Sequence, residues 1–161
     1  MNLIKLIRKQ LADDTNLTII RADQTGNIPN LPYATYKVIS DRKGVGQEDV
    51  SHVDTFDSLV ETRTQERNST ISFNIYGTSL DNAFEVATQL RKWFEWRGSL
   101  FLEDINVAVV NITDVTNRTT FLVDTYDEKW GFDVIIRYLN IDEHDIDYFD
   151  KVEYEIIRDR E

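Results

Sequence analysis

The chain of 161 residues contains no cysteine, two prolines, two histidines and six glycines. Without cysteine it has neither a disulfide framework nor thiol chemistry, which fits a reducing compartment. No apolar run approaches the roughly 18 residues that cross a bilayer, so we expect no membrane-spanning segment. The first fourteen residues interleave apolar side chains with Lys5, Arg8 and Lys9, and this pattern argues against a secretory signal.

Acidic residues outnumber basic ones, and the formal net charge is −11. Residues 124–161 carry thirteen acidic and five basic side chains, which gives this stretch a charge of −8. Such a surface repels a phosphate backbone and argues against sequence-specific DNA binding. A surface that keeps the chain soluble is the simpler interpretation, although weak adhesion would also help DNA to pass through a pore.

The length fits a single domain over residues 1–161. Apolar spacing predicts an amphipathic N-terminal helix over 2–12 and a long central helix over 79–97. Loops at 114–118 and 126–131 would connect strands of the C-terminal half. We therefore expect an α+β fold with an antiparallel or mixed β-sheet, a long central amphipathic helix and an N-terminal helix packed against it. The predicted strands are 17–22, 33–40, 71–76, 106–112, 119–124, 132–139 and 152–158.

The central helix has the strongest sequence signal. A capping box of Thr78 with Asp81, or Ser79 as a rival N-cap, would begin it, and Gly98 fits the residue just after its end. Its core face recurs at helical spacing through Leu80, Ala83, Phe84, Ala87, Leu90 and Phe94.

Polar sequence dominates residues 41–70. Residues 41–49 predict a flexible loop, and residues 59–66 alternate only weakly before the clean alternation of 71–76. A turn near 67–69 would join the last two segments as a hairpin. We expect 41–70 to contain a long loop and a projecting hairpin arm, which reaches toward a neighbouring subunit or a lumen because it buries little within its own chain.

No pattern in the chain predicts a catalytic, cofactor or metal site. His52 and His144 lie in acidic segments far apart in sequence, where a histidine is usually solvated. An EF-hand loop beginning at Asp142 fails, because Asp147 occupies the position that requires glycine. A small metal-dependent hydrolase that uses Asp142, Asp145 and Asp147 remains an alternative function of another class.

Three tryptophans allow two interpretations each. Trp93 and Trp96 lie three residues apart beside the core stripe of the central helix, and Trp130 precedes a predicted strand. Packing at the edge of the core is the simpler interpretation. The alternative is an interface anchor, since tryptophan is enriched at interaction hot spots.

Four stretches together resemble the phage tail-terminator, or neck-terminator, family: YATYKVIS (33–40), ETRTQERNSTISFNIYG (61–77), QLRKWFEWRG (89–98) and YDEKWGFDVIIRY (126–138). The resemblance implies a tail-terminator-like fold that acts as a structural protein and not as an enzyme. It implies a homohexameric ring that is assembled in the host bacterial cytoplasm and located in the neck of the virion. No cofactor and no membrane are implied.

The partners implied by the resemblance are the tail tube protein and a head-side connector or stopper protein. The ring would cap the tube, end its polymerisation and let DNA pass through its lumen without sequence-specific binding. A head-completion or stopper ring is the alternative within structural proteins. Candidate contacts with the lumen, the tube or another subunit are Glu61, Arg63, Glu66, Arg67, Trp93, Trp96 and Trp130.

Overall fold

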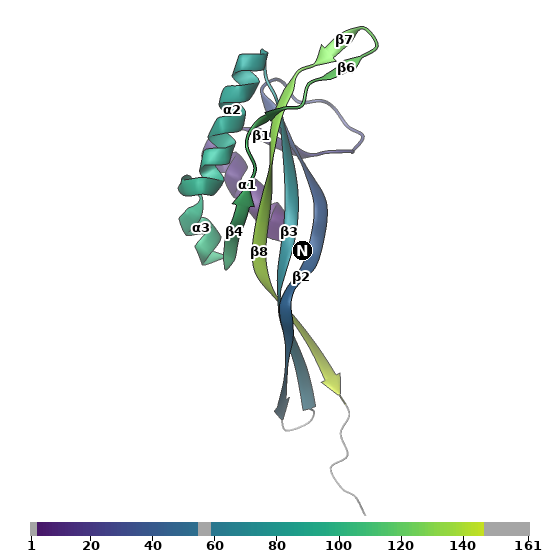
Figure 1. The fold of residues 1–161 in the computed structure, drawn as a ribbon, viewed down its shortest axis with the longest axis vertical. Coiled ribbons are helices and arrows are strands. Elements are labelled where there is room, and N and C mark those ends of the chain that lie inside the picture. The colour runs from purple at the N-terminus through teal and green to yellow at the C-terminus, as the bar shows by residue number, and fades with distance from the viewer. Residues whose placement is uncertain (1–2, 55–58, 147–161) are drawn as a thin grey trace, which may run out of the picture.

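The computed structural model describes residues 3–54 and 59–146, and shows a mixed sheet with helices packed on it (Figure 1). The helical elements are α1 (Leu3–Thr15), α2 (Leu80–Lys92), the π-helical segment Trp93–Arg97 and α3 (Ser99–Asp104). The strands are β1 (Thr18–Arg21), β2 (Tyr33–Asp54), β3 (Leu59–Tyr76), β4 (Val107–Ile112), β5 (Thr116–Asn117), β6 (Thr120–Leu122), β7 (Thr125–Asp127) and β8 (Lys129–Ile146).

The main sheet has the strand order β1-β2-β3-β8-β4, and β5 pairs with β8. β1 runs parallel to β2, and the other pairings are antiparallel. The α+β class and the mixed sheet, with a core made mostly of strands, are confirmed. β6 and β7 form a separate two-stranded hairpin.

The core lies between one face of the sheet and the helices. Ile71, Phe73 and Ile75 alternate along β3 and are buried, as a half-covered strand requires. The ring of Phe73 lies 5.5 Å from that of Phe132 on β8 and 5.4 Å from that of Phe94, measured between centroids. This cluster joins the sheet to the helical layer.

The helix after β3 is shorter than the sequence pattern predicts. Ser79 is its N-cap, because its hydroxyl oxygen accepts a hydrogen bond from the amide N–H of Asn82 at 3.2 Å. The prediction of a long amphipathic helix over 79–97 is wrong, because the α-helix ends at Lys92 and the chain continues as a π-helical segment. In that wider turn the consecutive residues Trp93 and Phe94 are both buried.

The N-terminal helix α1 closes one end of the core. Ile7 and Leu11, one turn apart, are fully buried among sheet and helix residues. The guanidinium of Arg8 donates to the carbonyl of Ile19 at 3.2 Å, which ties the helix to β1. The predicted helix is therefore present and extends to Thr15.

Two expectations for residues 41–70 are wrong. The segment 41–49 belongs to β2, and β3 passes through 67–69 without a turn. Asn68 there is paired on both sides, with Lys43 of β2 and Arg137 of β8. The projecting hairpin therefore consists of β2 and β3, with β8 as a third strand.

The C-terminal half also differs from the prediction. The predicted strand 119–124 contributes only the three residues of β6, which pair with β7 and not with the main sheet. The predicted loop 126–131 is occupied by the end of β7 and the start of β8. The strand predicted at 152–158 lies outside the described residues.

Candidate functional site: a three-stranded arm

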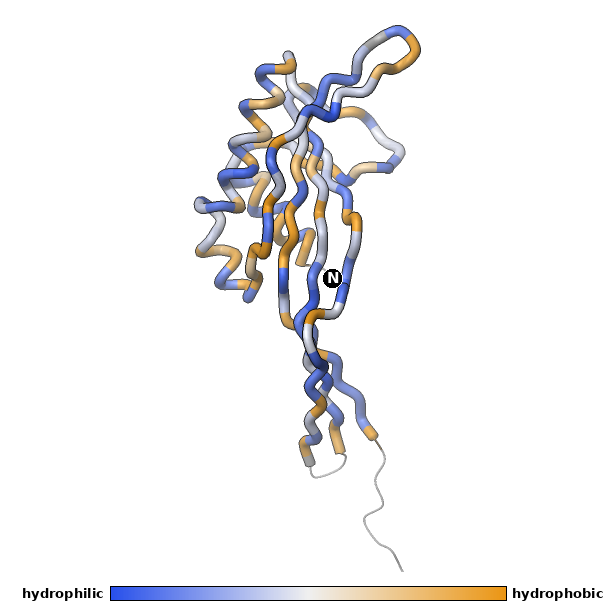
Figure 2. The backbone as a smooth tube through the Cα atoms, viewed as in Figure 1, coloured by the Kyte–Doolittle hydropathy of each residue, from blue (hydrophilic) through white to orange (hydrophobic). Residues whose placement is uncertain are grey.

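The most prominent feature for function is an extension of the sheet, called the arm here, formed by residues 41–54 of β2, 59–70 of β3 and 137–146 of β8. Its strands run away from the body and carry no helix among the described residues (Figure 1). Along the same strands, apolar residues are frequent in the body and sparse in the arm, which is largely hydrophilic (Figure 2). Because no described helix covers either face of the arm, its side chains are available for contacts with other chains.

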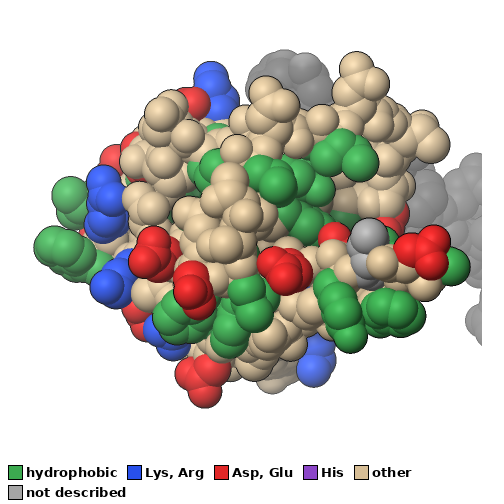
Figure 3. All heavy atoms as spheres, turned by 90° about the horizontal axis from the view of Figure 1, so that it is seen from above, with side chains coloured by type: hydrophobic (Ala, Val, Ile, Leu, Met, Phe, Trp, Pro, Cys, Tyr) green, Lys and Arg blue, Asp and Glu red, His purple; other side chains and the backbone are tan. Residues whose placement is uncertain are grey.

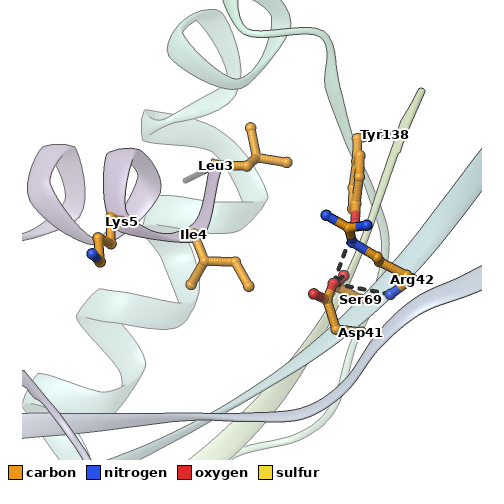
Figure 4. Close-up of a pocket in the computed structure, with 7 residues that line it drawn as sticks. All are labelled: Leu3, Ile4, Lys5, Asp41, Arg42, Ser69 and Tyr138. Atoms are coloured by element: carbon orange, nitrogen blue, oxygen red, sulfur yellow. Dashed lines mark hydrogen bonds between the residues drawn. The ribbon is translucent and has the colours of Figure 1, made fainter. Parts of the chain in front are cut away.

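A hydrogen-bonded cluster holds the base of the arm, and Asp41 is its centre (Figure 4). The Asp41 carboxylate accepts from the Ser69 hydroxyl, from the Tyr138 hydroxyl at 3.2 Å and from the Arg42 amide at 2.9 Å. The Ser69 hydrogen bond is the main reason why the pKa of Asp41 is lowered, against the opposing effect of burial. The three strands of the arm are thereby tied together where they leave the body.

The same cluster sets a bend in β2. Pairing between β2 and β3 shifts register between Ser40 and Lys43, and Arg42 in this bulge has a φ of +56°, which is uncommon for a residue with a side chain. The guanidinium of Arg67 donates to the carbonyl of Arg42 at 3.1 Å. Arg67, a predicted contact residue, therefore also supports the bulge at the base of the arm.

A hollow of about 470 Å³ lies beside this cluster, between the start of α1 and the base of the arm. Leu3, Ile4 and Lys5 line it on the helix side; the side chains of Leu3 and Ile4 point toward the Asp41 cluster, and that of Lys5 points away (Figure 4). Its one carboxylate is Asp41, which has a lowered pKa and already accepts three hydrogen bonds. General acid–base catalysis is most efficient when the pKa lies near the operating pH, and the pKa of Asp41 is shifted away from neutral pH.

One face of the arm carries an ion cluster around Glu61. The Arg63 guanidinium contacts the Glu61 carboxylate at 2.7 Å and that of Glu48 at 3.6 Å, and His52 Nε2 lies 3.3 Å from Glu61. Glu61 is paired across the sheet with His52 on β2 and with His144 on β8. Both histidines of the chain, distant in sequence, thus flank one carboxylate on this face of the arm.

The ion cluster around Glu61 should depend on pH. Hydrogen bonding to Arg63 is the main cause of the lowered pKa of Glu61, and the reverse interaction raises the pKa of Arg63. The interaction with Arg63 stabilises the ionised form of Glu61, so the cluster persists at neutral pH. It is lost as the pH falls through the folded-state pKa of Glu61. We expect Arg63→Ala to shift the carboxyl titration of Glu61, followed by NMR, upward toward the ordinary range.

Arg67→Ala is the matched control for this titration, because Arg67 contacts Arg42 and not Glu61. We expect this variant to leave the midpoint of Glu61 unchanged. An unchanged midpoint in Arg63→Ala as well would show that the arginine does not hold the carboxylate.

The opposite face of the arm carries Glu66, whose carboxylate lies 3.3 Å from the Arg137 guanidinium. Neighbouring strand residues point to opposite faces. The strand therefore places Glu61, Arg63 and Arg67 on one face and Glu66 on the other, so the four predicted contact residues do not form one surface.

The acidic segment after residue 141 is strand up to Ile146. Asp142 is paired with Arg63 and Asp145 with Val60, which places the two carboxylates on opposite faces. No group of three metal-ligating side chains occurs within residues 3–54 and 59–146. Asp147, the third predicted ligand of the hydrolase alternative, lies outside that part of the chain.

The three tryptophans occupy different environments. Trp93 is fully buried, and its indole N–H donates to the Asp14 carboxylate at 2.6 Å, so it does not form a surface contact. Trp96 is 76% exposed and keeps its place as a predicted contact. Trp130 is half-buried, and its ring lies 4.8 Å from that of Phe84 in an edge-on arrangement.

The family described as phage neck terminator protein matches residues 1–160. The chain belongs to this family. Among curated proteins, none matches it.

Membership in the neck terminator family places the chain among structural proteins of the phage neck, which interact with other head and tail components. It also confirms the resemblance that the four sequence stretches indicated. No helix in the described part of the neck terminator is long and apolar enough to cross a membrane.

The sequence pattern missed two surfaces of this neck terminator. The Asp41 cluster gave no signal, because Asp41, Ser69 and Tyr138 lie far apart in the sequence and no pattern indicates that they come into contact. The β6–β7 hairpin exposes apolar side chains at its tip. Its signal was the unbroken apolar run Phe121-Leu122-Val123, which does not alternate as a half-buried strand would.

Proposed function

We propose that the chain assembles as a homohexameric ring that caps the end of the phage tail tube. Capping ends tube polymerisation, and the other side of the ring receives the head-side connector or stopper protein. The observation that carries the proposal is the arm: three paired strands that leave the body with neither face covered among the described residues. Family membership supplies the setting in the phage neck.

Capping by a ring depends on repeated contacts. A head-to-tail contact between subunits closes into a ring when the rotation between them is a whole fraction of a turn. Six arms presented together bind one tube end with high effective concentration, so the individual contacts need only be weak. The arm exposes the charged residues for such contacts, with Arg63 and Glu61 on one face and Glu66 on the other.

The proposed lumen suits the passage of DNA. A chain of this length has a radius of gyration of roughly 15 Å if globular, so six subunits in a touching ring leave a hole about one subunit wide. Acidic side chains outnumber basic ones along the arm. An acidic wall repels the phosphate backbone, and DNA then passes without sequence-specific contacts.

The test is to mix the purified chain with assembled tail tubes and image them by negative-stain electron microscopy. We expect density at one end of each tube, and tubes grown in the presence of the chain should stop lengthening. Binding to the isolated head connector, with bare tube ends, would instead assign the chain to a head-completion or stopper ring. Binding along the sides of the tubes would contradict both functions.

A further inference from the structure

The β6–β7 hairpin projects from the opposite end of the molecule to the arm (Figure 1). Phe121, Leu122, Val123 and Tyr126 are all exposed at its tip, and Val123 is 89% exposed. Phe121 and Tyr126 are paired across the hairpin, and their ring centroids lie 5.0 Å apart. Seen from this end, apolar side chains gather on the surface with acidic side chains between them (Figure 3). So concentrated an apolar tip indicates a docking element.

A hollow that suits such a tip lies on the outer face of α2. Its volume is about 360 Å³, and it is lined by Phe84, Glu85, Thr88, Gln89, Lys92 and Arg97. Phe84 is 44% exposed although it packs against Trp130, so the hollow presents an aromatic surface. Lys92 and Arg97 place two exposed basic side chains at its rim.

We infer that the β6–β7 tip of one subunit docks into the α2 hollow of the next copy of the same chain. The apolar tip matches the aromatic surface of the hollow. The exposed Asp124 at the turn matches Lys92 and Arg97, which outnumber the acidic Glu85 in the described lining of the hollow. Apolar contact in the centre with charged groups around it is the usual anatomy of a protein interface.

The position of the two elements makes this contact head-to-tail. In Figure 1 the hairpin extends to one side of the molecule, whereas α2 lies on the other side of the sheet. Each subunit therefore offers one tip and receives one tip, which is the arrangement that closes into a ring. The inference rests on the proposed ring, and names the surfaces that join its subunits.

The natural absence of cysteine allows a clean cross-linking experiment. Val123→Cys at the tip is combined with Thr88→Cys in the hollow, and the purified full chain is oxidised alone and in the presence of tail tubes. We expect a ladder of disulfide-linked species that extends beyond the dimer in at least one condition. The matched control combines Val123→Cys with Glu103→Cys, an exposed position on α3 outside the hollow, and should give no ladder.

Several outcomes would overturn the inference. The absence of a ladder in both conditions would do so, and so would a ladder that stops at dimers. Cross-linking of the Val123→Cys single variant to the same extent as the double variant would also do so, because it would place two tips together. A second variant, Val123→Asp, should weaken subunit association about tenfold or more in sedimentation experiments. Unchanged association of Val123→Asp would overturn the inference. If Val123→Asp still formed oligomers but no longer bound tubes, the tip would be assigned to the tube contact, and the inference would be overturned as well.

The experiments distinguish a failure of this inference from a failure of the proposed function. A ladder without decoration of tube ends would retain the subunit contact and contradict capping. Decorated tube ends without a ladder would retain capping and contradict this contact.

Discussion

Replacement of Trp93 by alanine should lower the free energy of unfolding by about 3–5 kcal/mol, the range for a large aromatic side chain removed from a core. The Trp93 ring is fully buried and packs edge-on against Phe94, with 5.0 Å between the ring centroids. Its indole N–H also donates to Asp14 at 2.6 Å, so the substitution leaves this carboxylate without its partner. The cavity and the lost hydrogen bond act together, and we expect a clear fall in the urea midpoint.

Trp96→Ala is the matched control, because it removes the same side chain three residues away. Trp96 is 76% exposed, so its loss should change the free energy of unfolding by no more than about 0.5 kcal/mol. Both variants are compared by urea denaturation followed by circular dichroism. Similar losses of stability in the two variants would contradict the assignment of Trp93 to the core.

Gly98 makes the packing of Trp93 possible. A Cβ atom at position 98 would lie 2.5 Å from Cε2 of the Trp93 indole, well inside van der Waals contact. The backbone there has a φ of −89°, so the glycine is required for close approach and not for a left-handed helix end. The sequence identified Gly98 as a helix terminator for the wrong physical reason.

The part of the fold that the sequence predicts well is the part that buries one face. Alternation in residues 71–76 and the helical spacing from Leu80 onward both record contact with the core, and both elements are present. The π-helical turn escaped prediction because two adjacent buried residues, Trp93 and Phe94, also fit the apolar face of a regular α-helix, which contains neighbours at i+3 and i+4.

The arm escaped prediction because its stability does not come from a buried face. Residues 41–54 form a strand through pairing with β3, while their side chains stay largely exposed and show no period of two. Gly46 lies in the register shift between Val45 and Asp49, where the pairing of β2 becomes irregular. Gln65 supports this irregularity with a hydrogen bond from its amide to the carbonyl of Gly46 at 3.3 Å. Such a strand differs from a loop only in its pairing across the sheet, and a single sequence does not show that pairing.

The predicted contact residues do not lie on one surface, for the same reason. Sequence proximity grouped Glu61, Arg63, Glu66 and Arg67, whereas the strand separates them by face. It also grouped Trp93 with Trp96, although one is in the core and the other is exposed. Which charged residues share a surface is decided by strand register, and the register of β3 follows from pairing with both neighbours.

If the arm makes the capping contact, Thr62→Pro should abolish capping while the body stays folded. Thr62 lies on the central strand of the arm, paired with Ser51 on one side and Glu143 on the other. Proline lacks the amide N–H and does not fit a central strand, so the pairing of the arm is disrupted at Thr62. Tubes grown with this variant should lengthen as freely as tubes grown without any terminator.

Thr62→Ala keeps the amide N–H and serves as the matched control, so it should cap tubes normally. Hydrogen exchange separates the arm from the body: in Thr62→Pro the amides of the arm should exchange faster, and those of Ile71, Phe73 and Ile75 should stay protected. Normal capping by a variant with an opened arm would remove the arm from the capping mechanism and leave the body of the ring as the surface that meets the tube.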